Sequence, residues 1–336
     1  MNSFGTLFRV AIIGESHGPA VGVVVDGCPA GIPLAVEDFK EDMGRRKSGA
    51  PGTTSRKEPD LPKVMSGLYN GHTTGTPLTI LVDNTNVRPS DYSGLEDIPR
   101  PGHADFTASK KYGGFEERHG GGHFSGRLTA ALVAAGVVAK KVIYPVNCLS
   151  DIIELGGLKD QELVLNKAME EQDSIGGLIG CTISNVPAGL GEPFFDSVES
   201  LISHIVFSIP AIKGIEFGSG FQAARMKGSD HNDLIIDRDG TTKTNNAGGI
   251  NGGISNGNEI VFRVAVKPTS SISRPQRTIN MKTGEMTDLV IGGRHDVCIA
   301  LRIPVIIEAA AAIVLADLML LEQRIPRINK DKKLNE

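Results

Sequence analysis

The stretch IPVIIEAAAAIVLADLMLL, residues 303–321, is a long apolar segment interrupted by two acidic side chains, Glu308 and Asp317. The run AAAAIVLA between them is too short to cross a bilayer, whose hydrocarbon core needs about 20 apolar residues in a helix. Its Ala, Leu and Val content favours a helix. The segment therefore predicts a helix buried in a protein core, and we expect no membrane partner.

Strand-like and helix-like runs alternate along the rest of the chain. Runs rich in branched residues predict strands at 7–13, 21–25, 78–82, 178–186 and 259–266. Helices are predicted at 36–46, 127–141, 196–207 and 304–324, with Asp196 as N-cap of the third and Glu199 as its capping-box partner. No polar linker divides the chain. We therefore expect one α+β domain of sheets and covering helices over residues 1–326, followed by a mobile charged tail over 327–336.

Composition excludes several classes of protein. The chain has 336 residues, of which 40% are apolar, so it can bury a large core and is not intrinsically disordered. A net charge of −4, 5% aromatic residues and the absence of Trp argue against a nucleic-acid partner. The N-terminal sequence MNSFGTLFRV lacks a signal-peptide pattern. Because the four cysteines lie far apart (Cys28, Cys148, Cys181 and Cys298), we expect no metal site and reduced thiols in a cytoplasmic protein.

Glycine is unusually frequent, with 41 residues, or about 12% where ~7% is usual. Gly- and Pro-rich stretches at 44–62, 84–103, 113–122, 214–220 and 245–257 are far longer than ordinary connections of about 4–6 residues. Long loops in a compact chain are usually functional. The sequence therefore predicts an enzyme whose site is assembled from several loops.

Two of the glycine-rich motifs place a histidine where it could transfer protons. GESHG (14–18) places His17 between glycines after a strand. RPGHAD (100–105) places His103 close to a carboxylate. Each could also be a turn residue without a role, although imidazole suits proton transfer near neutral pH. In RHGGGHFSGR (118–127), His119 and His123 have zinc-helix spacing, but three intervening glycines make a helix improbable. A glycine loop leading to Arg127 is a better anion site.

Cations recur on the same kind of loop. They occur in GRRKSG (44–49), shortly afterwards at Arg56, in KPTSS (267–271) and in GGRHD (292–296). GSGFQA (218–223) imitates a dinucleotide fingerprint, but no convincing helix follows it. Bringing these cations together is costly unless anions compensate them, so we infer a polyanionic small ligand in a composite pocket. The cations in question are Arg45, Arg46, Arg56, Arg127, Lys267 and Arg294.

In their order along the chain, these motifs resemble the chorismate synthase family of the shikimate pathway. The resemblance extends over almost the whole chain, through FGTLFRVAIIGESHG, RPGHADFTASKKYGG, HGGG, NAGGINGGISNG, KPTSS and GGRHD. Several long motifs in the right order are far more specific than any single one.

The resemblance implies a carbon–oxygen lyase of aromatic amino acid biosynthesis. Such enzymes convert 5-enolpyruvylshikimate 3-phosphate to chorismate by a 1,4-anti elimination of phosphate. They require reduced FMN (FMNH2), although the reaction causes no net redox change. The implied fold is a sandwich of antiparallel sheets flanked by helices, assembled as a homotetramer. Whether such a chain reduces its own flavin with NADPH or receives it reduced is left open.

The resemblance also implies a role for particular residues. His17 is similar to a proton donor near flavin N1, and His103 to the histidine that assists phosphate departure. Asp296 is similar to the carboxylate that helps remove the C6 proton, and Ser16 and Ser125 match active-site serines. The implied substrate-binding residues are Arg45, Arg46, Arg56 and Arg127. The implied flavin-binding residues are His123, Phe124, Ser125, Pro210, Ala211, Gly252, Lys267, Pro268, Thr269, Ser270, Ser271 and Arg294.

Some positions depart from the family pattern. HFSGRLT (123–129) stands where the family commonly has RSSARET, Pro210-Ala211 where it has Asn-Ala, and KSG (47–49) where it has RPG. These changes bear on flavin affinity and rate. Two other hypotheses are a flavoprotein reductase, which the missing dinucleotide fingerprint disfavours, and a non-catalytic homologue that binds a polyanion. A zinc hydrolase is disfavoured because the histidine pairs lack a helix.

Overall fold

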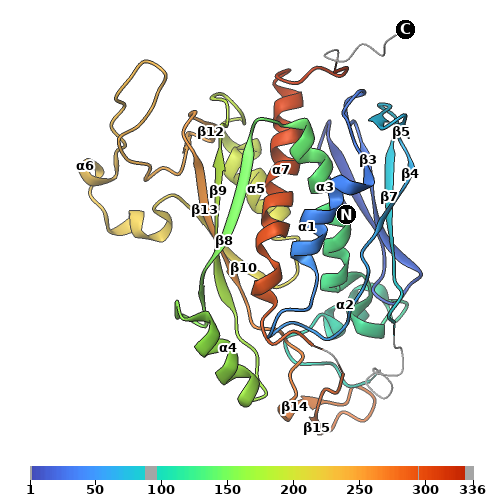
Figure 1. Cartoon of the computed structure of the whole chain (residues 1–336). Helices are drawn as coiled ribbons and strands as arrows, with labels where there is room; N and C mark the ends of the chain where they lie inside the picture. Colours follow the sequence, from blue (N-terminus) through green and yellow to red (C-terminus); the bar gives the residue numbers. More distant parts are fainter. Residues whose placement is uncertain (1, 88–96, 294, 330–336) are drawn as a thin grey trace.

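Two antiparallel sheets lie on either side of a layer of helices (Figure 1). The computed structural model describes residues 2–87, 97–293 and 295–329. The five-stranded sheet runs β1 (Ser3–Phe4), β2 (Arg9–Gly14), β3 (Ala20–Asp26), β7 (Leu78–Asp83), β4 (Pro62–Ser66). The four-stranded sheet runs β10 (Ile212–Phe217), β13 (Ile260–Val266), β9 (Gly177–Ser184), β8 (Asn147–Leu155). Three two-stranded pairs are β5 (Leu68–Tyr69) with β6 (His72–Thr73), β11 (Ile250–Asn251) with β12 (Ile254–Ser255), and β14 (Gln276–Ile279) with β15 (Met286–Leu289).

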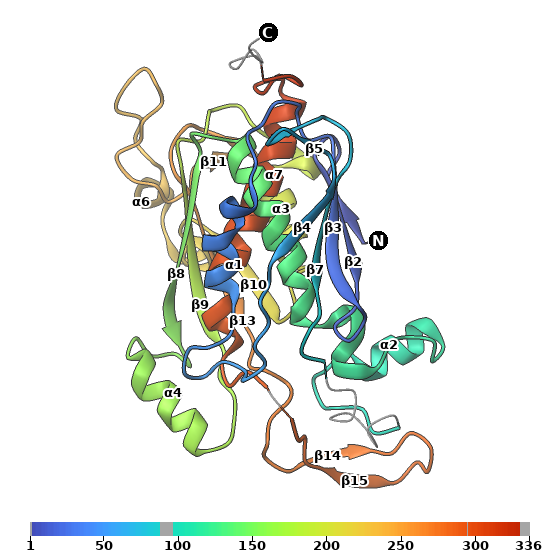
Figure 2. The ribbon, with the colours of Figure 1, turned by 45° about the vertical axis from the view of Figure 1, so that its right-hand side comes forward.

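The helical layer fills the space between the sheets. Its long members are α3 (Thr129–Val142), which packs on β3 and β7, and α7 (Pro304–Leu321), which packs on β8 and β9. The other helices are α1 (Lys40–Arg46), α2 (Asp105–Tyr112), α4 (Gln161–Glu170), α5 (Val198–Val206) and α6 (Gly228–His231). Short 3-10 segments occur at Val36–Phe39, His119–Phe124, Gly126–Leu128, Phe194–Asp196, Gly220–Arg225 and Ile299–Arg302. Figure 2 shows α2, α4 and the β14–β15 pair at the end of the molecule where α7 begins.

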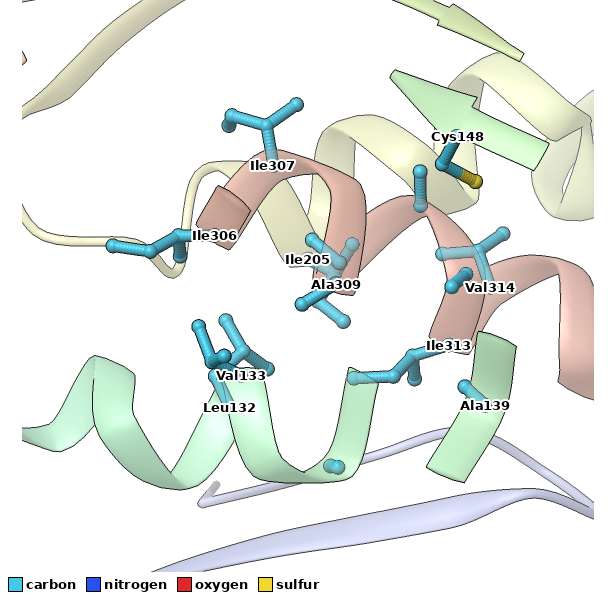
Figure 3. Packing of buried hydrophobic residues seen from close by; sticks show 14 of the residues in the cluster. Leu132, Val133, Ala139, Cys148, Ile205, Ile306, Ile307, Ala309, Ile313 and Val314 are labelled. Atoms are coloured by element: carbon cyan, nitrogen blue, oxygen red, sulfur yellow. The ribbon is translucent and has the colours of Figure 1, made fainter. Parts of the chain in front are cut away.

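The centre of the core is the contact between α3 and α7 (Figure 3). A Cβ atom at Gly136 of α3 would lie 2.2 Å from the Cβ of Ala309 on α7, so only glycine allows this approach. Helix α7 is long and apolar enough to span a membrane, but 89% of it is buried inside the protein. It therefore serves as the core helix that its sequence predicts.

Two carboxylates on α7 connect this core to distant parts of the chain. Glu308 is 1% exposed and accepts bonds from Arg45 (two, each 2.7 Å), Lys140 (2.8 Å) and the backbone N–H of Ser150 (3.0 Å). Asp317 accepts from the backbone N–H groups of residues 6–8 at 2.6–2.8 Å. A charge inside a core is tolerated only when it is paired in this way.

The structure confirms an α+β fold with antiparallel sheets, and the helices that flank these sheets form the layer between them. The five predicted strands match β2, β3, β7, β9 and β13. The predicted N-cap was wrong: Ser197, not Asp196, accepts the bond from the N–H of Ser200 at the start of α5. Strand β8 was missed because it buries Ser150 while exposing Leu149 and Ile153. The order of polar and apolar residues along this strand therefore does not match the order of exposed and buried ones.

The predicted tail, 327–336, begins at a fixed point. The carbonyl of Arg327 accepts a bond from the N–H of Ala30 (3.0 Å), and the N–H of Asn329 donates to the carbonyl of Ala30 (2.9 Å). Residues 327–329 are therefore hydrogen-bonded to the segment around Ala30. The remainder of the tail lies outside the described residues.

Candidate active site

Seven stretches of the chain (2–16, 46–60, 100–104, 120–132, 204–213, 267–271 and 295–306) surround a cavity of about 730 Å³, which lies within the usual size range of small-molecule sites. Eight described Lys and Arg residues line it against three carboxylates, Glu58, Asp60 and Asp296. These cations are Arg46, Lys47, Arg56, Arg100, Arg127, Lys213, Lys267 and Arg302. Another part of the wall is apolar, with Phe4, Val10, Ile12, Leu132, Ile205, Ile209, Ile299 and Ile306. The cavity therefore suits a ligand that combines negative charges with an apolar part.

Asp60 holds two of these arginines. Arg46 bonds to one carboxylate oxygen and Arg127 to the other, and all three side chains are buried. Arg127 also donates to the Oδ1 of Asn84 (2.8 Å) and the carbonyl of Asp83 (3.0 Å). Burial, together with the charges of Arg302 and Arg127, lowers the pKa of Arg46 to about 10. Because Arg46 and Arg127 share the single carboxylate of Asp60, the three side chains together keep a net positive charge.

The glycine run Gly120–Gly122 lies between two histidines. All three glycines have positive φ (65°, 101° and 50°), which residues with a side chain rarely adopt. A Cβ at Gly120 would lie 2.3 Å from Cε1 of His17, and one at Gly121 would lie 3.1 Å from Cε1 of His103. The run therefore has to be glycine so that its backbone can contact both imidazole rings.

His17 is half-buried behind this run, and its neighbours perturb it. Burial, and then the nearby charge of Arg56, lower the pKa of His17 below its ordinary value. Arg56 is held by the carboxylate of Glu58 (3.0 and 2.8 Å) and donates to the Ser16 carbonyl (3.2 Å) and Oγ (3.3 Å). His17 is therefore biased toward the neutral form beside a fixed cation.

Asp296 is fixed from two sides. Its Oδ1 accepts a bond from the N–H of Thr54 (2.9 Å), and its carboxylate pairs with Arg302 at 3.2 Å. The Nε of Arg302 donates to the carbonyl of Arg46 (2.9 Å), which joins this pair to the buried arginines. The carboxylate predicted to remove a proton thus faces the cavity in a defined position.

The segment 267–271 is tied to the His103 loop. Lys267 donates to Ser270 (2.6 Å), whose Oγ donates in turn to the carbonyl of Gly102 (2.7 Å). Burial, and then the charge of Lys213, lower the pKa of Lys267. Ala211, in the loop before β10, has φ +76° and accepts from the N–H of Lys267 (2.9 Å). Hydroxyls, a cation and irregular backbone therefore meet at one wall.

Most of the predicted site residues come together in this cavity. Those lining it are Ser16, Arg46, Arg56, His103, His123, Phe124, Ser125, Arg127, Pro210, Ala211, Lys267, Thr269, Ser270, Ser271 and Asp296. His17 does not line it, whereas Gly120, which packs against the His17 ring, does. Arg45 does not line it either, because its guanidinium is bound to Glu308. Gly252, in the turn between β11 and β12, and Pro268 are also absent from the wall, and Arg294 lies outside the described residues.

Sequence reasoning missed several residues of this site. Arg100 stands at the start of the quoted motif RPGHAD, so its position next to a histidine was an available signal. Asp60 and Arg302 occur in unremarkable surroundings, and nothing local indicates that they hold Arg46 and Asp296. His119 and His123 do not converge, since His119 bonds to Glu117 and His123 to the carbonyl of Gly14 (2.9 Å). Within the described residues, no group of three or more His, Cys, Asp or Glu side chains could hold a metal ion.

Comparisons with known proteins identify the family of the chain. A family model described as chorismate synthase matches residues 8–320. A chorismate synthase from Chitinophaga pinensis is 61% identical over 332 residues, covering 98% of this chain and 100% of that protein. The chain belongs to the chorismate synthase family.

More distant chorismate synthases show the same extent of similarity. One from Methanocaldococcus jannaschii is 42% identical and covers 95% of this chain and 96% of its own length. A crystal structure of chorismate synthase superposes with a TM-score of 0.74 at 27% identity, covering 95% of this chain and 93% of that one. The chain is therefore a lyase of the shikimate pathway, which leads to aromatic compounds.

Chorismate synthases use reduced flavin, and the residues of this cavity fit such a group. Arg46 lines the cavity, and its buried Nε has no hydrogen-bond partner among the described residues. An unpaired buried donor is costly, and a ligand oxygen would satisfy it. The apolar wall and the hydroxyls of 269–271 suit the ring and the polar chain of a flavin mononucleotide.

Proposed function

We propose that this chain catalyses the 1,4-anti elimination of phosphate from 5-enolpyruvylshikimate 3-phosphate, giving chorismate and inorganic phosphate, with reduced FMN in the same cavity. The observation that carries the proposal is the excess of cations around a cavity closed by a glycine run between His17 and His103. The substrate has two carboxylates and one phosphate, and FMN adds another phosphate. Such ligands supply the negative charge that the cavity wall lacks.

Substrate anions are proposed to bind to the arginines of the 44–62 and 118–127 loops. Arg46 and Arg127 are buried and already held by Asp60, so they bind an anion without losing side-chain freedom. A guanidinium can donate two parallel bonds to a carboxylate or phosphate. Arg56 adds a third cation from the Ser16 side of the cavity.

Proton handling is assigned to three side chains. His103 lines the cavity and is proposed to donate a proton to the departing phosphate, which lowers the charge of the leaving group. Asp296 is proposed to help carry away the proton lost from C6, and His17 to hold a proton near the flavin. When bound, reduced flavin supplies the electron chemistry that no side chain provides.

The flavin would be held by residues from three loops. These are His123, Phe124 and Ser125, then Pro210 and Ala211, and then the segment 267–271. In this proposal Gly252 and Arg294 complete the set. We further propose a homotetramer, without nucleic-acid or membrane partners, in the cytoplasm. The four cysteines are all free and buried, which supports a reducing compartment.

An anaerobic assay tests the proposal directly. Purified protein mixed with substrate and photoreduced FMN should release phosphate and chorismate in equal amounts, with no net oxidation of the flavin. A folded protein that binds the substrate in calorimetry without turnover would instead be the non-catalytic homologue.

Two additions to the assay separate the remaining alternatives. Replacing photoreduction with NADPH tests whether the chain reduces its own flavin. Aerobic NADPH oxidation without the shikimate substrate, and no phosphate release with it, would identify a flavoprotein reductase. Light scattering coupled to size-exclusion chromatography tests the tetramer.

A further inference from the structure

A carboxylate outside the substrate cavity holds the histidine proposed to protonate the leaving phosphate. The Nδ1 of His103 lies 2.6 Å from the Oδ1 of Asp105. His103 lines the 730 Å³ cavity and also a neighbouring cavity of about 640 Å³, whereas Asp105 lines only the neighbouring one. Asp105 is therefore placed to act on the reaction through His103 and not by touching the substrate.

The contacts of Asp105 determine which nitrogen of His103 carries the proton. Arg100 also lies 3.1 Å from the Nδ1 of His103, and a guanidinium can only donate. If Nδ1 accepted that bond, its lone pair would face the Asp105 oxygen at 2.6 Å, which is repulsive. An Nδ1–H that donates to the carboxylate removes this conflict. The other nitrogen, Nε2, is then the one left to exchange a proton with the substrate.

Asp105 is itself rigidly held. Arg100 donates from Nε to Oδ2 (2.7 Å) and from NH2 to Oδ1 (2.8 Å), and its backbone N–H donates to Oδ2 (3.0 Å). Asp105 is also the first residue of α2, where the helix dipole favours a negative charge. Burial alone would raise its pKa, but the bonds from Arg100 and His103 lower the pKa well below its usual range. The carboxylate is thus a fixed acceptor.

The glycine run limits the movement of the ring from the opposite side. A Cβ at Gly121 would lie 3.2 Å from the Nε2 of His103, so the glycine run contacts this side of the ring. The ring is thus confined between Asp105 on its Nδ1 side and the glycine run on its Nε2 side.

We propose that Asp105 is a positioning residue for the elimination: it fixes the Nδ1–H tautomer of His103, so that Nε2 is the atom that donates the proton to the leaving phosphate. This rests on the role of His103 in the proposed function. In the protonated ring, Nε2–H donates to a phosphate oxygen, and the ring is left neutral with Nδ1–H still bound to Asp105. The phosphate gains that proton and leaves with the electron pair of the broken C–O bond.

Asp105→Asn is the informative variant. An amide oxygen in place of Oδ2 still accepts from the Nε and backbone N–H of Arg100, while an NH2 group in place of Oδ1 turns an N–H toward His103 and gives up the bond from the NH2 of Arg100. The neutral ring must then accept at Nδ1 and carry its proton on Nε2. We expect kcat to fall roughly 10–100-fold, as for other groups that orient a functional histidine, with KM little changed. Asp173→Asn is the matched control, since Asp173 pairs with Arg274 (2.9 Å) and does not line the cavity.

A double-mutant cycle separates positioning from a general structural effect. If Asp105 acts through His103, the variant with both Asp105→Asn and His103→Ala should have the kcat of His103→Ala alone. Multiplied losses in the double variant would overturn the proposal. A loss in Asp105→Asn that is matched by Asp173→Asn would overturn it as well.

Solid-state ¹⁵N NMR of histidine-labelled protein at a pH where the rings are neutral tests the tautomer without substrate or flavin. The His103 signals, identified by their loss in His103→Ala, should report Nδ1–H in the native protein and Nε2–H in Asp105→Asn. An Nε2–H signal in the native protein would refute the inference even if Asp105→Asn did not fold. If His103→Ala retained full turnover, the proposed role of His103 would fail while the tautomer result stood.

Discussion

Arg46 and Arg127 are bound to the two oxygens of a single carboxylate, that of Asp60, in the interior of the protein. Two buried cations share one anion, and among the described residues that line the cavity the other carboxylates are Glu58 and Asp296. This arrangement favours anionic ligands on electrostatic grounds. It also makes the folded protein depend on Asp60.

Replacing Asp60 with Asn should destabilise the protein by about 3–5 kcal/mol, the usual cost of leaving a buried charge without its partner. Added phosphate should restore part of the loss because it binds the folded state alone. Urea denaturation with and without phosphate measures both effects. Asp26→Asn, which breaks an exposed pair with Arg9, is the control and should cost about 0–1 kcal/mol. Equal losses in the two variants would contradict the prediction.

Glu308→Gln should reduce stability in a pH-dependent way. Burial alone would raise the pKa of Glu308, but the bonds of Arg45 and the charge of Lys140 lower it below its ordinary value. A lowered folded-state pKa contributes stability above the unfolded value of ~4.3, and this contribution is lost as the pH falls through the folded-state value. The difference in unfolding free energy between native protein and variant should therefore be largest near pH 7 and shrink in acid. A pH-independent difference would show that the charge of Glu308 does not matter.

Gly120→Ala should lower kcat by at least about tenfold because the new methyl group displaces the imidazole of His17. Gly71→Ala is the matched control: its φ of +72° imposes similar backbone strain, of order 1 kcal/mol, but nothing lies within 4 Å of the new Cβ. Both variants should lose similar backbone stability in thermal unfolding, while only Gly120→Ala loses activity. Full activity in Gly120→Ala would show that the position of His17 is unimportant.

The pKa of His17 should respond in opposite directions to its two charged neighbours. After burial, Arg56 lowers this pKa and Glu117 raises it. Arg56→Gln should therefore raise the pKa, and Glu117→Gln should lower it, in an NMR titration of the imidazole. If His17 donates a proton, the rate should fall as the pH rises through the pKa of His17, which lies below the ordinary value of ~6.5. A His17 pKa that is insensitive to both substitutions would exclude the proposed electrostatic coupling.

The loops of the site could be predicted because glycine runs, adjacent cations and histidines are visible in the sequence. The carboxylate that pairs with each cation could not be predicted, as Arg45 and Arg46 illustrate. They are consecutive residues on α1, and consecutive side chains on a helix point in different directions. Arg45 therefore meets Glu308 on α7, while Arg46 meets Asp60 beside the cavity. Only the packing of α1 decides which of the two lines the site.

The same limit applies to the fold. The pattern of apolar residues predicted the core helix and five strands, because these elements bury apolar side chains. It failed at β8, where the N–H of Ser150 is buried to bond with Glu308, a contact between residues 158 positions apart. It also misplaced the start of α5 by one residue, since both Asp196 and Ser197 are good capping residues.

The contact between Asp317 and the backbone of residues 6–8 has a consequence for how the chain is made. A ribosome delivers residue 317 only 309–311 positions after residues 6–8. The turn that precedes β2 therefore lacks its acceptor until α7 has been synthesised, and N–H groups of this kind must stay in water until then. A nascent chain released before its final helix would expose both the opening strand and the apolar surface that this helix covers, which makes premature termination a direct route to aggregation.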